Sequence, residues 1–379
     1  MTERTAWRTC PFCEATCGLE LTVNGGVSKV RGDEQDVFSH GFLCPKGVAL
    51  KELHEDHDRV RTPLLRQPDG TFAAASWDEA FAFIDERLGA LLAGGDRNAA
   101  GVYLGNPSAH NLSAILYGRA FIKALGTQNV FSASTVDQYP KQAQSALMFG
   151  GGFTVAVPDL DRTLYFLCLG ANPYASNGSL MTAPDVRGRI EGIQARGGKV
   201  VVVDPRRTRT ARAADEHLFI RPGTDALLLA GMVHTLFAEE LVALGTLSDH
   251  VAGVEDVRRL VEPFAPEAVA GPTGIAAGDV RRLAREVAAA ESAAVYGRIG
   301  TTTQRFGTTA SWLVDVLNVL TGNLDRPGGA MFPKAAAGAT NTKGTPGRGR
   351  GAVLGRWASR VRGAPEVFGE LPAACMAEE

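Results

Sequence analysis

Four of the six cysteines lie within the first 44 residues, at a spacing that suits a metal centre. Cys10, Cys13 and Cys17 form the pattern C-x2-C-x3-C, and Cys44 follows after 26 intervening residues with a proline directly behind it. Each iron of an iron–sulfur cluster takes one thiolate, so three close cysteines and one distant cysteine can surround a cluster. Structural zinc is the alternative, but it more often uses two separated ligand pairs. The spacing therefore favours a [4Fe-4S] cluster.

Lys46 lies two residues beyond the fourth cysteine of this pattern. A single lysine usually points into solvent. Beside a cluster, its positive charge could instead bridge to an anionic cofactor. The two remaining cysteines, Cys168 and Cys375, have no such neighbours in sequence, and we expect them to pack as small apolar residues.

Small and polar residues follow successive apolar, strand-like runs in the middle of the chain. They are Asn172 and Asn177 after the run 164–169, Asp204 and Arg206 after the run 199–203, and Gly223 and Asp225 ahead of a helix that starts near 226. An acidic residue after the second strand is where a dinucleotide-binding unit contacts ribose or base. Arginine suits phosphate, and the amides of a helix N-terminus favour an anion.

None of these loops is specific by itself, because Asn-Pro and Pro-Gly pairs also build ordinary turns. Three successive loops of the same character make a shared ligand site the better interpretation. The sequence contains neither a Walker A motif nor G-x-G-x-x-G, which disfavours a standard nucleoside triphosphate or nicotinamide site.

The elements that must position these loops alternate between strands and helices. Strands are expected at 164–169, 199–203, 217–220 and 293–296, and helices at 186–195, from 226, at 279–290 and at 312–320. This alternation predicts a parallel sheet that binds ligands at the carboxyl ends of its strands.

The first part of the chain has a different pattern. Two alternating runs flank a turn at Asn24-Gly25-Gly26 and predict a β-hairpin. Ser76 and Glu79 form a capping box for a helix that reaches about Leu92. A further helix is expected at 111–125, ending at a glycine.

Composition limits the classes of function. The 379 residues suffice for two or three domains, and a formal net charge of −2 gives no general attraction to nucleic acid. The longest apolar stretch, 226–244, is interrupted by charges, so we expect no membrane span. The N-terminus resembles no export signal, which predicts a cytoplasmic protein with reduced thiols.

Taken together, these residues resemble the molybdopterin-guanine-dinucleotide oxidoreductases of the dimethyl-sulfoxide-reductase family, which includes nitrate reductases and formate dehydrogenases. The resemblance extends from Thr9 to about Pro333. It is carried by the cysteine motif with its C-P-K-G end and by the segments L-G-A-N-P at 169–173, D-P-R-R-T at 204–208, R-P-G-T-D at 221–225 and T-G-N-L-D-R-P-G-G at 321–329.

The resemblance implies an α/β protein with a small N-terminal iron–sulfur domain containing β-hairpins, followed by Rossmann-like molybdopterin-binding domains. It implies a cluster domain at 1–62, the first part of an α/β domain at 63–133, a nucleotide-binding domain at 134–333 and a return segment at 334–379. Family members are usually much longer, so the chain resembles either a fragment or a protein completed by a partner chain.

The same resemblance implies two cofactors, a [4Fe-4S] cluster and molybdenum or tungsten in a bis(molybdopterin guanine dinucleotide). Cys10, Cys13, Cys17 and Cys44 would bind the cluster, and Lys46 would lie on the electron path to a pterin. One guanine dinucleotide would be lined by Asn172, Asn177, Asp204, Arg206, Gly223 and Asp225.

The family's metal takes one protein ligand from a loop that corresponds to 132–140 here, and this loop has no cysteine. Asp137 falls at the ligand position of nitrate reductases and formate dehydrogenases, and a carboxylate suits an oxidised molybdenum. Ser134 is a rival ligand, and Asp137 could instead form an ordinary turn. Gln138 stands where formate dehydrogenases have histidine, which makes formate a less expected substrate.

We therefore expect an oxidoreductase that passes electrons between a small substrate at molybdenum and the [4Fe-4S] cluster, with an electron-transfer partner protein. Two alternatives stay open at this point. One is a non-redox hydratase or lyase on the same scaffold. The other is a non-catalytic remnant that keeps only the cluster.

Overall fold

The computed structural model describes residues 2–178, 180–181, 183–333 and 353–379. Ser179 and the first part of the expected return segment, 334–352, lie outside the described residues. The chain divides into two compact units, one made of 1–133 with 355–379 and the other of 134–354. Among the described residues, no helix is long and apolar enough to cross a membrane.

The N-terminal part of the first unit is a three-stranded antiparallel sheet, which confirms the expected hairpin. Its strands are β1 (Arg4–Thr9), β2 (Gly18–Val23) and β3 (Val27–Gly32), in the order β1-β2-β3. Strand β1 was not apparent from the sequence, because most of its residues are exposed and give it no buried stripe. Two short helices follow, α1 (Pro45–Val48) and α2 (Leu50–Glu55).

The rest of the first unit is built from short elements. They are β4 (Leu64–Arg66), β5 (Phe72–Ala74), α3 (Trp77–Ala93), η1 (Arg97–Ala99), β6 (Val102–Leu104), η2 (Asn106–Ala109), the π-helical turn η3 (Ala114–Gly118), α4 (Arg119–Leu125), β7 (Val130–Ser132), β14 (Leu354–Ala358), β15 (Pro365–Val367) and η5 (Ala373–Cys375). The capping box of α3 forms as expected. Strands β6 and β7 pair in parallel, and Leu371 donates a backbone hydrogen bond to Val130 at 2.8 Å.

The second unit contains a parallel four-stranded sheet. Its strands are β9 (Tyr165–Leu169), β10 (Lys199–Val203), β11 (Glu216–Leu218) and β12 (Ala293–Gly297), in the order β11-β10-β9-β12. In chain order the sheet therefore runs 3-2-1-4, and the direction of winding reverses between β9 and β12. Ligands of such sheets bind outside the carboxyl ends of the strands at this reversal.

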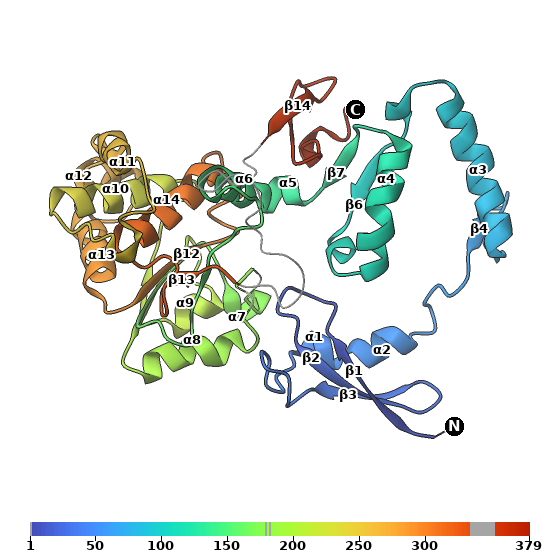
Figure 1. Cartoon of the computed structure of the whole chain (residues 1–379), viewed down its shortest axis with the longest axis horizontal. Helices are drawn as coiled ribbons and strands as arrows, with labels where there is room; N and C mark the ends of the chain where they lie inside the picture. Colours follow the sequence, from blue (N-terminus) through green and yellow to red (C-terminus); the bar gives the residue numbers. More distant parts are fainter. Residues whose placement is uncertain (1, 179, 182, 334–352) are drawn as a thin grey trace. The chain divides into compact units, whose positions relative to one another are not determined.

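Helices cover both faces of this sheet (Figure 1). One face carries α7 (Pro173–Ser176), α8 (Val186–Ala195) and α9 (Arg209–Ala213); the other carries α10 (Asp225–Ala238), α13 (Ala277–Ala289) and α14 (Gly307–Leu320). Alternate strand residues supply the two cores, so Phe166 and Cys168 face one layer while Leu167 and Leu169 face the other. Burial of both faces explains the nearly continuous apolar strands.

The remaining elements of the second unit are α5 (Ser134–Asp137), α6 (Tyr139–Phe149), β8 (Val157–Pro158), η4 (Gly245–Leu247), α11 (Val254–Val261), α12 (Pro266–Thr273) and β13 (Ala330–Met331). The segment 132–140 was expected to be a loop, and this was wrong, because α5 and the start of α6 occupy most of it. Pro140 lies in the first turn of α6, where its missing N–H costs nothing.

Candidate functional site

The first three cysteines lie on the connection between two antiparallel strands. Cys10 follows β1 and Cys17 precedes β2, and the Cys10 amide donates to the Cys17 carbonyl at 2.9 Å. The hairpin register therefore holds these two residues opposite each other, with Cys13 on the connecting loop. Cys10 and Cys17 are buried, and Cys13 is half-buried.

A second loop brings the fourth cysteine to this hairpin. The Gly18 amide, next to Cys17, donates to Ser39 Oγ at 3.0 Å, and Asp36 accepts hydrogen bonds from the amide and hydroxyl of Ser39. A side chain at Gly18 would collide with Asp36, whose Cβ would lie 2.6 Å away. The loop that leads to Cys44 is therefore tied directly to the start of β2.

The four thiols influence one another electrostatically. Burial and, to a smaller extent, the charges of Cys10, Cys13 and Cys44 together raise the pKa of Cys17 to about 11. The pKa of Cys10 is raised chiefly by burial and also by Cys13 and Cys44. Four thiols close enough to affect each other fit a shared site that only a bound cation would turn into thiolates.

A single metal ion and a [4Fe-4S] cluster need different spacings between their ligands. Among the described residues, no three cysteine, histidine or carboxylate side chains approach closely enough to hold one ion. Tetrahedral zinc requires all its ligands within about 2.3 Å of one centre. A [4Fe-4S] cluster places each thiolate on a different iron, so its ligands stand farther apart.

The candidate nucleotide site lies in the second unit, where the sheet reverses its winding. Gly170 follows β9 with a φ of 57°, and the Gly300 amide donates to its carbonyl at 2.9 Å. An added Cβ at Gly170 would lie 2.9 Å from the amide nitrogen of Thr301. The loops after β9 and β12 are therefore in direct backbone contact.

Two carboxylates meet at this edge. Burial raises the pKa of Asp204 above its usual value, and it raises the pKa of Asp225 too, with a further contribution from the charge of Asp204. Gln304 donates to Asp225 Oδ2 at 2.7 Å, while Gln304 Oε1 is buried without a hydrogen-bond partner among the described residues. A buried acceptor atom without a hydrogen-bond partner fits a ligand that brings an N–H or O–H donor.

The other predicted nucleotide residues lie in the loops around these carboxylates. Asn172 Oδ1 accepts a hydrogen bond from Thr210 Oγ1 at 2.8 Å and so also fixes the start of α9. Asn177 ends α7 in a left-handed conformation. Arg206 is exposed, and its amide donates to Asp204 Oδ1 at 2.7 Å. Gly223, at a φ of 83°, would bring an added Cβ to 3.9 Å from Gln304 Oε1.

Asp137, at the end of α5, belongs to the second unit as well. Its carbonyl accepts a hydrogen bond from Thr302 Oγ1 at 2.8 Å, and Arg298 Nη1 donates to the side chain of Gln138 at 3.1 Å. The Asp137 carboxylate is half-buried and forms no ion pair among the described residues. Lys46, by contrast, is exposed in α1 of the first unit.

Sequence reasoning missed a buried ion pair between α6 and α14. Lys141 of α6 donates to Asp315 Oδ2 of α14 at 2.6 Å, and both side chains are buried. With Arg298 they line a cavity of about 20 Å³, enough for a water molecule. No sequence signal could have paired residues so far apart, although a buried aspartate in the apolar run of α14 is itself unusual.

Comparison with known proteins adds evidence that is independent of this geometry. Residues 3–55 match the model of the molybdopterin oxidoreductase Fe4S4 domain, and residues 59–373 match the molybdopterin oxidoreductase model. The chain belongs to the molybdopterin oxidoreductase family. The predicted family and its two cofactor types, an iron–sulfur cluster and a molybdopterin-bound metal, are thereby confirmed.

Several curated relatives are similar to this chain over most of its length. Formate dehydrogenase H of Escherichia coli is 31% identical over 88% of the chain, which spans 47% of that protein. The assimilatory nitrate reductase catalytic subunit of Bacillus subtilis is 26% identical, over 86% of the chain and 45% of the relative. The molybdopterin-containing subunit of thiosulfate reductase from Salmonella typhimurium is 28% identical, over 86% and 42%. The chain spans about half the length of these relatives.

A solved structure agrees with the fold. Acetylene hydratase from Pelobacter acetylenicus superposes with a TM-score of 0.71 at 24% identity, covering 83% of this chain and 43% of that one. At this identity the likeness concerns the fold. It confirms the predicted α/β architecture of the molybdopterin oxidoreductase chain with its N-terminal iron–sulfur domain.

Proposed function

We propose that this chain is the cofactor-holding part of a molybdenum or tungsten oxidoreductase that passes electrons between a small oxyanion and a [4Fe-4S] cluster. The observation that carries the proposal is the set of four mutually interacting thiols on the β1–β2 hairpin and the loop tied to it. A cluster there accepts and releases one electron at a time. A small substrate exchanges two electrons in each reaction, so the metal centre must link the two-electron and one-electron steps. An electron-transfer partner protein follows from this role.

The loops at the sheet reversal hold one guanine dinucleotide in this proposal. Asp204 and Asp225 accept hydrogen bonds from guanine or ribose, and Gln304 Oε1 takes a further donor. Gly223 lets the ligand approach the backbone, and Arg206 contacts phosphate. Asn172 offers its amide group, because its oxygen is already bonded to Thr210, and Asn177 stands at the neighbouring helix end.

The bound metal supplies two-electron exchange with the substrate, and the protein contributes a ligand and the orientation of the site. Asp137 is the proposed ligand, since its carboxylate is half-buried and without an ion-pair partner among the described residues while Thr302 fixes its backbone. Ser134 is the alternative ligand. Lys46 is proposed to carry positive charge beside the cluster on the electron path.

The substrate class follows from the relatives. Formate, nitrate and thiosulfate, the substrates named for them, are all small oxyanions. Gln138 in place of histidine favours an oxyanion other than formate for this chain. The hydratase alternative is supported by fold likeness alone, so we do not favour it. Six cysteines without disulfides among the described residues suit a cytoplasmic location, which is also part of the proposal.

Anaerobic reconstitution of the chain with iron and sulfide tests the proposal. We expect about four irons per chain and a reduced-cluster signal in electron paramagnetic resonance. Cys44→Ser should lose most of the iron and of this signal. Cys168→Ser is the matched control, because Cys168 is fully buried in β9 and a serine there can donate to the Ala171 carbonyl, which the thiol faces at 3.8 Å. Equal iron contents in the two variants would refute the cluster assignment.

A further inference from the structure

Arg298 is a buried cation at the sheet edge where the candidate ligand loops lie. It directly follows β12, and only 7% of its surface is exposed. Its backbone amide donates to the carbonyl of Leu169, the last residue of β9, at 3.2 Å. The sheet reverses its winding between these two strands, which is the ligand side of such a sheet. The position of the guanidinium is therefore set by two strand ends.

Arg298 holds the side chain of Gln138, which follows the proposed metal ligand. Its Nη1 donates to Gln138 Oε1 at 3.1 Å, and Thr302 Oγ1 of the same loop donates to the Asp137 carbonyl at 2.8 Å. The Gln138 amide nitrogen donates to the carbonyl of Ser134 at 2.9 Å. Gln138 therefore stands next to one candidate metal ligand and one helical turn after the other.

The contact with Arg298 determines which end of the Gln138 side chain is left for a ligand. A guanidinium has only donors, so it can bind only the oxygen of a side-chain amide. Two N–H donors remain on Gln138 Nε2, and they bond to no acceptor on the described residues. Gln138 precedes α6, but its side chain does not cap that helix. Donation to Oε1 also polarises the amide and so strengthens its N–H donors.

We propose that Gln138 is a specificity-determining residue that donates a hydrogen bond to an oxygen of the small oxyanion substrate. Arg298 is its positioning residue, because it keeps the NH2 group turned away from the protein and available to the substrate. This inference rests on the proposed function, which places the oxyanion at a metal held by Asp137 or Ser134. A fixed and uncharged donor favours substrates that present acceptor oxygens. An amide also takes up no proton near neutral pH, whereas an imidazole can.

Equilibrium binding of nitrate to the cofactor-loaded chain tests the role of Gln138. Calorimetric titration with the metal oxidised and no electron donor present measures binding without turnover. Gln138→Glu keeps the size of the side chain and an acceptor for Arg298 but removes the NH2 donors, so it should raise the dissociation constant at least roughly tenfold. Gln142→Glu is the matched control, because it makes the same change at a half-buried glutamine one turn farther along α6. It should change the dissociation constant by less than about threefold.

A double-mutant cycle tests whether Arg298 acts through Gln138. Arg298→Met alone should raise the dissociation constant of nitrate roughly tenfold, because the released amide can turn its oxygen toward the anion. In the Gln138→Met background the same change should have a much smaller effect, since no amide is left to orient. Arg298→Lys keeps a donor for Oε1 and should recover part of the loss. Circular dichroism checks that each variant stays folded, and with an electron donor the changes should appear in KM more than in kcat.

Three results would overturn the inference. The first is that the wild-type loaded chain binds neither nitrate nor thiosulfate. The second is that Gln138→Glu weakens nitrate binding no more than Gln142→Glu does. The third is an equal effect of Arg298→Met in both backgrounds, which would mean that Arg298 acts by its own charge. Failure of the proposed function gives a different pattern: nitrate binding responds to the variants as expected, which supports the inference, while the loaded chain transfers no electrons to any oxyanion.

Discussion

At the scale of single residues, the cysteine site combines burial with mutual repulsion. A thiol whose pKa is raised to about 11, as at Cys17, is protonated at neutral pH in the metal-free chain. Iron must therefore displace protons, and cluster assembly should become less favourable as the pH falls. Backbone contacts of Cys10 with Cys17 and the contact of Gly18 with Ser39 hold the loops that carry these cysteines.

Asp137 offers the sharpest test at the same scale. Asp137→Ala should change the first shell of the bound metal in X-ray absorption, replacing a protein oxygen by water or oxo, and should abolish turnover. The [4Fe-4S] signal should persist, because the cysteines belong to the other compact unit. Ser134→Ala is the control and should leave the metal shell unchanged. The reverse pattern in the two variants would transfer the ligand role to Ser134.

The sequence proposed these residues as candidates by type and spacing, but it could not predict all of the residues that contact them. Asp204 and Asp225 could be predicted because each directly follows or precedes an element of clear periodicity. The contact between Asp225 and Gln304, and the ion pair of Lys141 with Asp315, join residues 79 and 174 positions apart. Such contacts arise from the packing of α6, α10 and α14, which no local pattern encodes.

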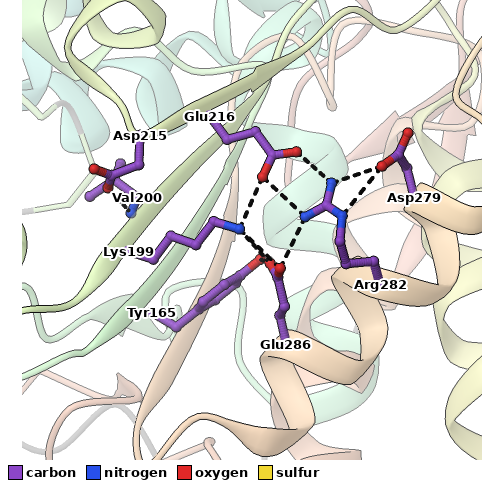
Figure 2. Close-up of polar contacts among 8 residues, drawn as sticks. All are labelled: Tyr165, Lys199, Val200, Asp215, Glu216, Asp279, Arg282 and Glu286. Carbon is purple, nitrogen blue, oxygen red and sulfur yellow. Dashed lines mark hydrogen bonds and ion pairs between the residues drawn. The ribbon is translucent and has the colours of Figure 1, made fainter.

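At the scale of elements, the amino ends of the second unit's strands are locked by an ionic network (Figure 2). Lys199 of β10 lies 2.9 Å from Glu286 of α13 and 3.0 Å from Glu216 of β11. Arg282 pairs with both glutamates, and the Tyr165 hydroxyl donates to Glu286 Oε2 at 2.8 Å. The network ties three strands to α13 at the sheet edge opposite the candidate nucleotide site.

Glu286→Gln should reveal the contribution of this network. Burial alone would raise the pKa of Glu286, but hydrogen bonds from Lys199, Tyr165 and Arg282 lower it below the ordinary value for a glutamate, about 4.5. The stabilisation is therefore complete above about pH 4.5 and is lost as the pH falls through the depressed value. At pH 7 the variant should lose roughly 1–2 kcal/mol in urea unfolding, with a smaller difference near pH 3.

The control for this prediction is Glu255→Gln. Glu255 is exposed and stands 3.7 Å from Arg258, so its removal should change stability little at any pH. A loss for Glu286→Gln that stayed constant between pH 7 and pH 3 would contradict the electrostatic explanation.

Helices and strands could be predicted from the sequence where one pattern of apolar residues was strong. Helix α8 and strand β10 have the expected bounds, because an apolar helical stripe and a fully buried strand are strong local patterns. The expected strand at 217–220 lies instead at Glu216–Leu218, since pairing with β10 determines its ends. The helix expected at 111–125 opens with a π-helical turn, which apolar periodicity does not distinguish from an α-helix.

At the scale of the whole molecule, the proposed function gives the two compact units two different cofactor tasks. The four cysteines lie in the unit that contains 1–133, and the candidate nucleotide loops lie in the unit 134–354. The chain spans 47% of the length of formate dehydrogenase H of Escherichia coli.

If one unit binds the nucleotide and the other the cluster, each ligand should change the melting temperature of its own unit only. Guanosine diphosphate, used as a probe, should raise the melting temperature of one calorimetric transition, and removal of the cluster should lower the other. At a concentration one hundred times its dissociation constant, a ligand adds about 2.7 kcal/mol to the free energy of unfolding, which raises the melting temperature of a unit of this size by roughly 5–10 °C.

Asp204→Asn should abolish the nucleotide shift while keeping the acceptor for the Arg206 amide. Cys44→Ser should leave that shift intact, because the cysteine belongs to the other unit. A nucleotide shift that survives Asp204→Asn, or one that disappears with Cys44→Ser, would show that the two tasks are not divided between the units in this way.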